Sequence, residues 1–542
     1  MLKYCLILIF LINSAISFAQ IGTFSKADSL RGTLTEYRTC FDVTYYNLYI
    51  RINPRDSSIA GSNTISFKVL KPFRKIQIDL FENMIIDSIV YKGKKLKYER
   101  EYNAVFILFD NIINSADALT IYYHGKPIVA KHPPWDGGFS WKKDKNKEDW
   151  IGVSCEGKGA SLWWPNKDHP YDEPDSMRIN CSVPKHLVAV SNGRLRSIVD
   201  EANDYKRYSW QVTYPINNYN VSINIGDYDH FSSIHIFNQD SLDLDYYVLS
   251  YNLEKAQTHF KQVDSILTCL ETYLGAYPFP KDGYKLVETS YLGMEHQSGI
   301  AYGNKYKKGY LGYSALKLDF DYIIMHETAH EWWGNSLTAH DMAELWIHES
   351  FATYSEYLFV RCKYGEDTGL KYLLSQRLKI LNRKPLVGPL GVNYDPPGEI
   401  YYKGAWVLHT LRNVINNDSL WFATIKELAN KFKMSIVSTD DIIDFFEIKT
   451  SLDLQYFFEQ YLYKAAIPVL EYKFKKKNKK FEFDYRWIKT NDNFKMPIRV
   501  MINNRLLEIV PNVTWQTKVF DEKYKSFDMP LSAYLIFGRE IK

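Results

Sequence analysis

The sequence predicts a multidomain α+β protein, and three observations lead to this fold class. The chain has 542 residues, enough for about three domains of ordinary size. Apolar and polar residues alternate between turn residues from about residue 40 to 230, which predicts strands. The spacing becomes helical after about residue 250, and alternation returns after Pro468. We therefore expect a β domain, a mixed domain weighted to helix, and a small β domain.

The first region contains short strands that end at turn residues. Alternation predicts strands over 46–52, 63–69 and 76–80, and Gly, Pro, Asn and Asp separate them. The run Val190-Ser191-Asn192-Gly193 predicts a turn between two further strands. With the leader removed, this β domain is expected to occupy residues 20–235.

The second region, residues 236–466, combines helices with a buried strand. Helical spacing is found over five stretches, 253–275, 320–333, 345–364, 369–381 and 404–414, and a strand is expected over 284–289. The third region, 467–542, has strands over 469–474 and 481–487. These two strands flank a turn containing Lys475, Lys476, Lys477, Lys479 and Lys480. Such a turn is either a solvated hairpin tip or a site for an anionic partner.

The N-terminus has the pattern of a cleaved export signal. A short basic start, Met1-Leu2-Lys3, precedes an apolar stretch, and Ser17-Phe18-Ala19 ends it with small residues at cleavage-site spacing. Residues 1–19 are therefore a predicted signal peptide, with Gln20 as the new N-terminus. The alternative is an uncleaved anchor, but the apolar run is short for a bilayer. We expect an exported protein, periplasmic or extracellular, with no integral membrane segment after cleavage.

Composition and charge exclude several kinds of protein. Hydrophobic residues make up 46% of the chain and charged residues 24%, which is ordinary for a globular protein. A net charge of +4 is too weak to indicate nucleic acid or a membrane surface as a partner. Five cysteines remain after the leader, far apart and without a CxxC pair, so a cysteine metal site is not expected and pairing cannot be deduced.

The most specific motif is His326-Glu327-Thr328-Ala329-His330, followed by Glu349. On a helix, residues four apart share a face, so the two histidines can bind one metal ion while Glu327 remains free to act as a general base. Glu349 would complete a His₂Glu set that leaves a position open, which predicts one catalytic Zn²⁺ per chain. The alternative is a solvated helix with two unrelated histidines. The apolar run Tyr322-Ile323-Ile324-Met325 argues against it, because it predicts a buried helix.

Several motifs together resemble the aminopeptidase N family of gluzincin zinc metallopeptidases, whose relatives include leukotriene hydrolase. The resemblance runs from about residue 40 to the end and rests on the metal motif and three segments, Gly293-Met294-Glu295-His296, Trp346 to Ala352, and Tyr401-Tyr402-Lys403-Gly404-Ala405. It implies an N-terminal β-saddle domain, a thermolysin-like α/β catalytic domain and a small C-terminal β-sandwich. It also implies a bacterial exported member without the large helical C-terminal domain of longer relatives.

The resemblance assigns roles to further residues. Gly293 and Met294 would form an edge strand that pairs with the substrate backbone, and Glu295 would bind the free α-amino group. Because an α-ammonium is largely cationic at neutral pH, it favours a buried carboxylate. Glu156 would be the second residue on that amine, although the surrounding pattern departs from the family. Tyr401 would donate a hydrogen bond to the oxyanion of the tetrahedral intermediate.

The resulting expectation is a zinc aminopeptidase that removes N-terminal residues from peptides. Water attacks the scissile carbonyl with Glu327 as general base, and the substrates are peptides with a free N-terminus. The alternatives are a zinc endopeptidase, a lipid epoxide hydrolase by kinship, and a non-catalytic peptide-binding relative. Three positions depart from the family pattern without removing a ligand or the base, namely His296, Glu344 and the His348-Glu349-Ser350 run.

Overall fold

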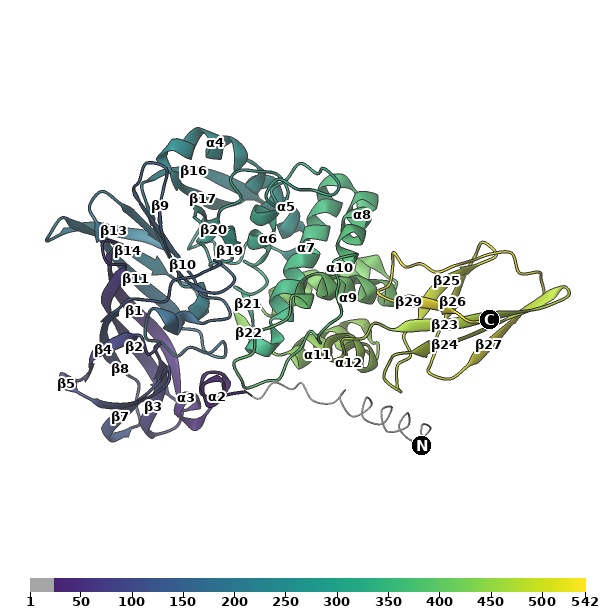
Figure 1. Cartoon of the computed structure of the whole chain (residues 1–542), viewed down its shortest axis with the longest axis horizontal. Helices are drawn as coiled ribbons and strands as arrows, with labels where there is room; N and C mark the ends of the chain where they lie inside the picture. The colour runs from purple at the N-terminus through teal and green to yellow at the C-terminus, as the bar shows by residue number, and fades with distance from the viewer. Residues whose placement is uncertain (1–23) are drawn as a thin grey trace, which may run out of the picture.

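The computed structural model describes residues 24–542 and confirms the predicted multidomain α+β architecture (Figure 1). Sheets of the N-terminal region stand at one end, the helices lie in the middle, and the C-terminal sheets form the other end. The predicted signal peptide falls outside the described residues. None of the helices described is long and apolar enough to cross a membrane.

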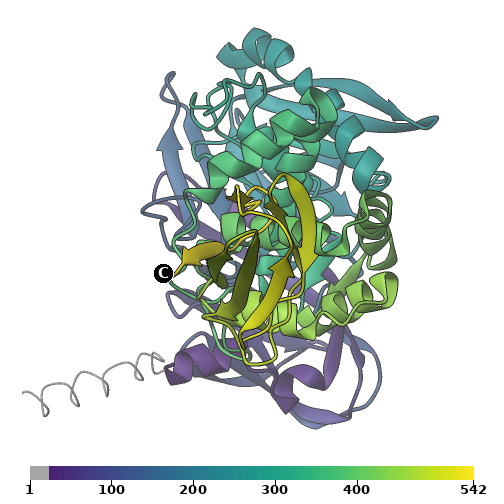
Figure 2. The same cartoon turned by 90° about the vertical axis from the view of Figure 1, so that its right-hand side faces the viewer.

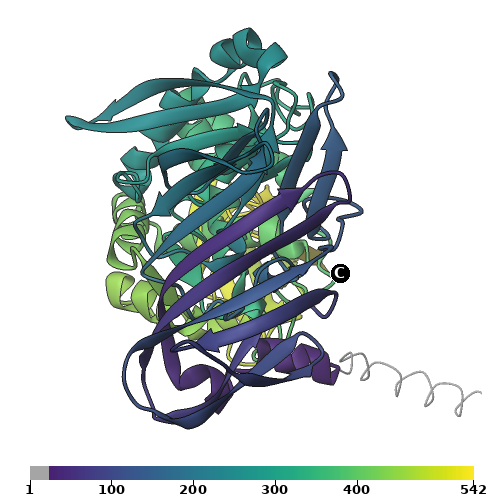
Figure 3. The same ribbon diagram turned by 90° about the vertical axis from the view of Figure 1, so that its left-hand side faces the viewer.

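The N-terminal region is built on a large sheet whose strands cross one whole side of the molecule (Figure 3). Its eight strands run in the order β13-β14-β11-β1-β2-β8-β4-β5, and sheets β12-β15-β10-β9 and β3-β7-β6 complete the region. In β1, Tyr46, Leu48, Ile50 and Ile52 are fully buried, as the alternating pattern predicts. The elements are α2 (Lys26–Gly32), α3 (Glu36–Thr39), β1 (Phe41–Asn53), β2 (Ser58–Val69), β3 (Phe73–Asp79), β4 (Met84–Tyr91), β5 (Lys94–Lys95), β6 (Lys97–Glu101), β7 (Ala104–Ile113), β8 (Asp117–Gly125), β9 (Gly138–Lys143), β10 (Asp149–Ser154), β11 (Ser176–Pro184), β12 (Val188–Ser191), β13 (Arg194–Glu201), β14 (Tyr205–Val212) and β15 (Ile223–Gly226).

The middle region packs helices against a five-stranded sheet in the order β16-β17-β18-β20-β19. The strand predicted over 284–289 is β18, and β16 spans the predicted boundary between residues 235 and 236. The strands are β16 (Tyr228–Phe237), β17 (Asp240–Leu249), β18 (Tyr284–Glu288), β19 (Gly293–Met294), β20 (Ile300–Tyr302), β21 (Leu337–Ala339) and β22 (Ser435–Val437). The helices are α4 (Leu253–His259), α5 (Gln262–Leu274), α6 (Tyr322–Ala329), α7 (Trp346–Tyr364), α8 (Glu366–Arg377), α9 (Glu399–Ile415), α10 (Asp418–Lys431), α11 (Thr439–Thr450) and α12 (Gln455–Tyr463).

Two helix predictions need correction. The helix predicted over 253–275 is two helices, because α4 ends at His259 and a turn at Phe260 and Lys261 redirects the chain into α5. The helix expected to start at Gly404 begins five residues earlier, at Glu399. Tyr401 and Tyr402 therefore lie within the first turn of α9, where their side chains are held by the helix backbone.

A disulfide that the sequence could not assign joins Cys269 of α5 to Cys362 of α7, across 93 residues of chain. Cys40, Cys155 and Cys181 are buried free thiols. A crosslink over this length restricts the unfolded chain strongly. It ties the sheet-covering helix α5 to the C-terminal end of α7.

The C-terminal region forms two sheets that project from the helices, as Figure 2 shows end-on. Their strand orders are β27-β24-β23-β29 and β26-β25-β28. The lysine-rich turn lies at the tip of the β23–β24 hairpin, where Lys475 Nζ is 2.8 Å from Asp484. The strands are β23 (Val469–Lys477), β24 (Lys480–Ile488), β25 (Ile498–Ile502), β26 (Arg505–Ile509), β27 (Gln516–Phe520), β28 (Phe527–Asp528) and β29 (Phe537–Glu540).

The first described residues reach across to the middle region. Arg31 Nη1 donates to the carbonyl of Gly157 at 2.7 Å and to the side chain of Asn393. Thr33 Oγ1 donates to the carbonyl of Gly391 at 2.8 Å. The α2 segment is thereby fastened to the loop that precedes α9 and Tyr401.

Candidate active site

Three ligand atoms of the predicted metal set converge on one point. His326 Nε2 and His330 Nε2 are 3.3 Å apart, and Glu349 Oε2 lies 3.4 and 3.5 Å from them. The α-helical turns of α6 end at Ala329, but His330 keeps helical backbone angles of −64° and −19°. The second imidazole therefore still stands one turn above the first.

The surroundings of both imidazoles prepare them as metal ligands. His326 Nδ1 is 2.9 Å from Glu356 Oε1, and His330 Nδ1 is 2.8 Å from the carbonyl of Trp333. Because each Nδ1–H donates to one of these acceptors, Nε2 of each ring is left facing Glu349. Among the described residues, buried Glu349 Oε2 has no hydrogen-bond partner. Two imidazoles and a carboxylate are the donor set that catalytic zinc favours, so the residues fit this ion.

Two helices hold the ligands in place. Asp321 caps α6, and its side chain accepts from the backbone N–H groups of Ile323 and Ile324. On α7, Glu356 follows Glu349 by seven residues, which is two turns along the same face. Glu356 Oε2 accepts from Tyr372 and Gln376 of α8, each at 2.7 Å. These two hydrogen bonds fix the Glu356 carboxylate, which in turn orients the His326 ring.

Glu327, the predicted general base, faces the edge strand β19. Gly293 of β19 comes so close that an added Cβ would lie 2.6 Å from Glu327 Oε1. A side chain at position 293 would displace the Glu327 carboxylate. Steric exclusion therefore explains why the Gly-Met-Glu segment begins with glycine. Burial raises the pKa of Glu327 to about 8. A carboxylate with a raised pKa is a stronger base when ionised.

The carboxylates predicted to bind the substrate amine lie together with the third metal ligand. Oxygen atoms of Glu156, Glu295 and Glu349 are all within 4.8 Å of one another. Glu295 is only 3% exposed and accepts a hydrogen bond from Tyr219 Oη at 3.1 Å, while its backbone carbonyl accepts from Asn335 at 2.8 Å. Burial, followed by the charge of Glu295, raises the pKa of Glu156 well above its ordinary value. An acidic cluster with two buried members and a half-buried one, Glu156, favours a cationic group between its members.

Tyr401 lies beside the metal ligands. Its ring stacks on that of His326, with the ring centroids 6.0 Å apart. Burial keeps the pKa of its phenol well above the ordinary value, so the group retains the proton needed to donate a hydrogen bond. Close packing of α9 on α7 brings it there. A Cβ on Gly404 would lie 1.7 Å from Ser350 Oγ, so only glycine allows this approach.

All of the predicted site residues line one cavity of about 850 Å³. They are Glu156, Gly293, Met294, Glu295, His326, Glu327, His330, Glu349 and Tyr401. Their roles remain predictions, but no member is misplaced. Two further residues of the site were not predicted. No local pattern marks Tyr219, whereas the seven-residue spacing from Glu349 was the available signal for Glu356.

The three departures from the family pattern have structural partners or a buried setting. Burial lowers the pKa of both His296 and His348 to about 3, so both rings are neutral. His348 Nε2 accepts from the backbone N–H of Ala339 at 2.8 Å. Glu344 Oε1 accepts from the backbone N–H of Thr439 at 2.7 Å and so supports the start of α11.

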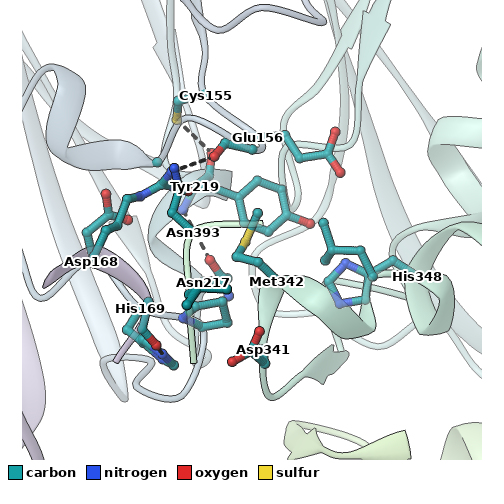
Figure 4. A pocket seen from close by; sticks show the side chains of 17 residues that line it. Cys155, Glu156, Asp168, His169, Asn217, Tyr219, Asp341, Met342, His348 and Asn393 are labelled. Carbon is teal, nitrogen blue, oxygen red and sulfur yellow. Dashed lines mark hydrogen bonds between the residues drawn. The ribbon is translucent and has the colours of Figure 1, made fainter. Parts of the chain in front are cut away.

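A second cavity, of about 570 Å³, lies next to the first and shares Glu156 with it (Figure 4). Tyr219 and His348 also line this cavity, and their rings stack at 6.5 Å. Arg31 reaches it from the α2 segment. Residues from three distant parts of the chain thus meet around this cavity beside Glu156.

Comparison with known proteins supports this arrangement. The chain is 24% identical to human endoplasmic reticulum aminopeptidase 1 over 433 residues, covering 74% of this chain and 44% of the relative. It is 22% identical to aminopeptidase N of Lactobacillus helveticus over 470 residues, covering 80% of this chain and 52% of the relative. The chain thus spans about half the length of these curated relatives, or less.

Solved structures share the fold. An M1 zinc metallopeptidase of Deinococcus radiodurans matches with a TM-score of 0.64 at 20% identity, covering 76% of this chain and 90% of that one. A point mutant of the Deinococcus enzyme, bound to a Tyr-Ser-Ala substrate, matches with a TM-score of 0.65 at 18% identity, covering 79% and 96%.

Two domain models of one family match consecutive parts of the sequence. The peptidase M1 N-terminal domain matches residues 43–219, and the peptidase family M1 domain matches residues 258–461. Together the two matches make up most of the chain, and the second contains all three metal ligands. This protein therefore belongs to peptidase family M1.

Proposed function

We propose that this protein is a zinc-dependent aminopeptidase that releases N-terminal residues from peptides. One observation carries the proposal: the carboxylates of buried Glu295 and half-buried Glu156 line the same cavity as the His₂Glu set and Glu327. The metal set alone suits any zinc peptidase. The acidic pair adds a place for a positive charge one residue from the scissile bond, and a free α-ammonium supplies that charge.

Each step of the reaction has a residue in place. His326, His330 and Glu349 would hold zinc, which when bound would supply Lewis acidity to polarise the scissile carbonyl and lower the pKa of water. Glu327 takes a proton from the attacking water as its oxygen bonds to the carbonyl carbon. It then delivers that proton to the leaving nitrogen as the C–N bond breaks. The Tyr401 phenol donates a hydrogen bond to the oxyanion.

The remaining residues orient the substrate. Glu295 and Glu156 bind the α-ammonium, and Tyr219 holds the Glu295 carboxylate in position. β19 lies at the edge of its sheet, so one side of its backbone is free to pair with an extended peptide. Because the amine is anchored one residue from the reacting carbonyl, only the first peptide bond reaches Glu327.

A panel of aminoacyl-arylamides tests this function directly. We expect hydrolysis of several members, loss of activity with a chelator, and recovery on adding Zn²⁺. Peptides of one sequence with a free or an acetylated N-terminus give the decisive comparison, in which the acetylated form should be cut at least about 100-fold more slowly. Equal rates for the two would identify an endopeptidase instead.

We further propose that the protein is exported to the periplasm or the exterior. The pattern of residues 1–19 supports this, and so does the Cys269–Cys362 disulfide, because such bonds persist in oxidising compartments. N-terminal sequencing of the natural protein should find Gln20 first, in the exported fraction. Recovery of an intact Met1 from the cytoplasm would contradict the proposal.

A further inference from the structure

A tyrosine-lined groove continues from the active-site cavity. We call it the tyrosine groove and define it by Tyr310, Tyr313, Tyr322, Tyr402 and Lys379, which line a cavity of about 830 Å³. Tyr310, Tyr322 and Tyr402 also line the active-site cavity, so the two spaces share these walls. A peptide leaving the metal site on this side would enter the groove.

The groove lies at the opposite end of α6 from the proposed amine site. Asn335, just beyond the C-terminal end of α6, holds the carbonyl of Glu295, whereas Tyr322 is the first residue of this helix. With a rise of about 1.5 Å per residue, Tyr322 and His330 are separated by roughly 12 Å along the axis. A substrate whose first residue is held by Glu295 therefore extends toward Tyr322.

The walls of the groove are rigid near the metal and open farther away. The Tyr322 ring stacks on His326 with centroids 5.5 Å apart, and the Tyr310 ring meets Tyr322 edge-on at 5.6 Å. Tyr313 is 70% exposed. Aromatic rings offer apolar contact to many side chains, so these walls favour a peptide without selecting one sequence.

Lys379 is the cation of the groove. Its Nζ is 3.2 Å from Tyr402 Oη and 4.7 Å from the centre of that ring. No carboxylate of the described chain forms an ion pair with it. Arg383 and Lys384 lie with it around a neighbouring cavity, where Glu399 accepts from the backbone of Arg383 rather than from Lys379. The exposed end of the groove thus has an ammonium group ready for an anion.

We propose that the tyrosine groove binds the residues that follow the scissile bond and that Lys379 binds the C-terminal carboxylate of short peptides. This inference rests on the proposed aminopeptidase function and makes tri- and tetrapeptides its best substrates. Tyr402 reaches from the active-site cavity to Lys379, and a tyrosine side chain spans about two extended residues of roughly 3.5 Å each. The carboxylate of the second or third residue after the scissile bond therefore meets Lys379.

Paired peptides test this assignment in the zinc-loaded full chain. Each pair has one sequence and ends in either a free carboxylate or an amide, and its first residue is the best one from the arylamide panel. We expect kcat/KM for the free acid to exceed that for the amide about two- to fivefold in tri- and tetrapeptides, as an exposed ion pair allows. The ratio should fall to near one for peptides of about ten residues.

Three variants locate the effect. Lys379→Gln should bring the acid-to-amide ratio close to one, and Lys379→Arg should retain part of it. Lys371→Gln changes an exposed lysine of α8, the helix that ends two residues before Lys379, and should leave the ratio unchanged because Lys371 lies outside the groove. A wild-type ratio near one, or an unchanged ratio in Lys379→Gln, would overturn the proposal.

Two further arms separate the possible causes of failure. A tripeptide amide with glutamate in third place tests an acidic side chain as the ligand, and an equal gain there would overturn recognition of the C-terminus. Calorimetry of the tripeptide acid and amide binding to Glu327→Gln gives the ratio of their dissociation constants without turnover. We expect the acid to bind more tightly by the same factor. If the arylamides themselves are not cut, the proposed function fails, whereas hydrolysis of arylamides with equal acid and amide binding refutes the role of Lys379 alone.

Discussion

The two ends of the active-site cavity are built on opposite principles. The end that holds Glu295, Glu156 and Tyr219 is acidic and largely buried, and Tyr219 donates a hydrogen bond to Glu295 there. The tyrosine groove at the other end is open, aromatic and basic, with Tyr313 mostly exposed and Lys379 free of carboxylate partners among the described residues. Both ends share the walls around the metal ligands.

The contrast predicts how strongly each end discriminates between peptide substrates. A buried charge left without its partner costs several kcal/mol, whereas exposed ion pairs contribute about 0–1 kcal/mol. We therefore expect the acidic end to decide whether a peptide binds productively at all. The tyrosine groove should only change the rate for peptides that bind, according to their length and the charge of their last residue.

The largest expected effect comes from the group between the two ends. Glu327→Gln removes the general base and should lower kcat about 10²- to 10⁴-fold while peptide binding at both ends survives. Steady-state kinetics and metal analysis measure turnover and zinc content separately. Glu508→Gln, an exposed carboxylate of β26, is the matched control. Normal turnover in Glu327→Gln would contradict the mechanism.

A substitution at Glu295 is the most direct test of the acidic end. Glu295→Gln keeps the shape of the side chain but removes its charge, and kcat/KM for free N-termini should fall about 10²-fold. The gap between free and acetylated peptides should narrow by the same factor, with zinc content unchanged. If the variant still discriminates between free and acetylated peptides as the wild type does, Glu295 is not the amine ligand.

A smaller effect is expected from removing one hydrogen bond at the same acidic end. Tyr219→Phe removes the hydroxyl that donates to Glu295 Oε1 at 3.1 Å, which leaves the carboxylate present but less fixed. We expect KM for free-amine substrates to rise about tenfold with little change in kcat. Tyr122→Phe, an exposed tyrosine of β8, controls for loss of a hydroxyl as such. An unchanged KM would mean that Tyr219 only packs against its neighbours and does not position Glu295.

The Lys379 variants should show the smallest effect on kcat/KM, because Lys379 lies at the open, solvent-exposed end of the groove.

Much of the fold and the ligand set could be predicted because the signals are local. The alternation in β1 and the spacing of His326 and His330 are both read within a few residues, and the structure has a strand and a helix at these places. Glu349 and Glu327 follow from the same motif. The resemblance then supplied Glu156, Glu295 and Tyr401, all of which line the active-site cavity.

The features that were missed depend on contacts between distant segments. Tyr219 meets Glu295 across 76 residues, and nothing beside it distinguishes it from 41 other tyrosines of the chain. Cys269 and Cys362 pair only because α5 packs against α7, which no cysteine spacing reveals. The break between α4 and α5 has a similar origin, since the apolar spacing continues through the turn at Phe260 and Lys261.

The docking of the α2 segment has a consequence for the order in which the molecule assembles. Arg31 and Asn393, which bond to each other, are 362 residues apart in the chain, and Thr33 and Gly391 are 358 apart. A contact of such high sequence separation must wait until the intervening chain has been made and folded. The first part of the described chain to leave the ribosome is thus among the last to reach its native position. A fusion attached ahead of α2 would interfere at this late stage, whereas one attached after β29 lies on the far side of the molecule (Figure 1).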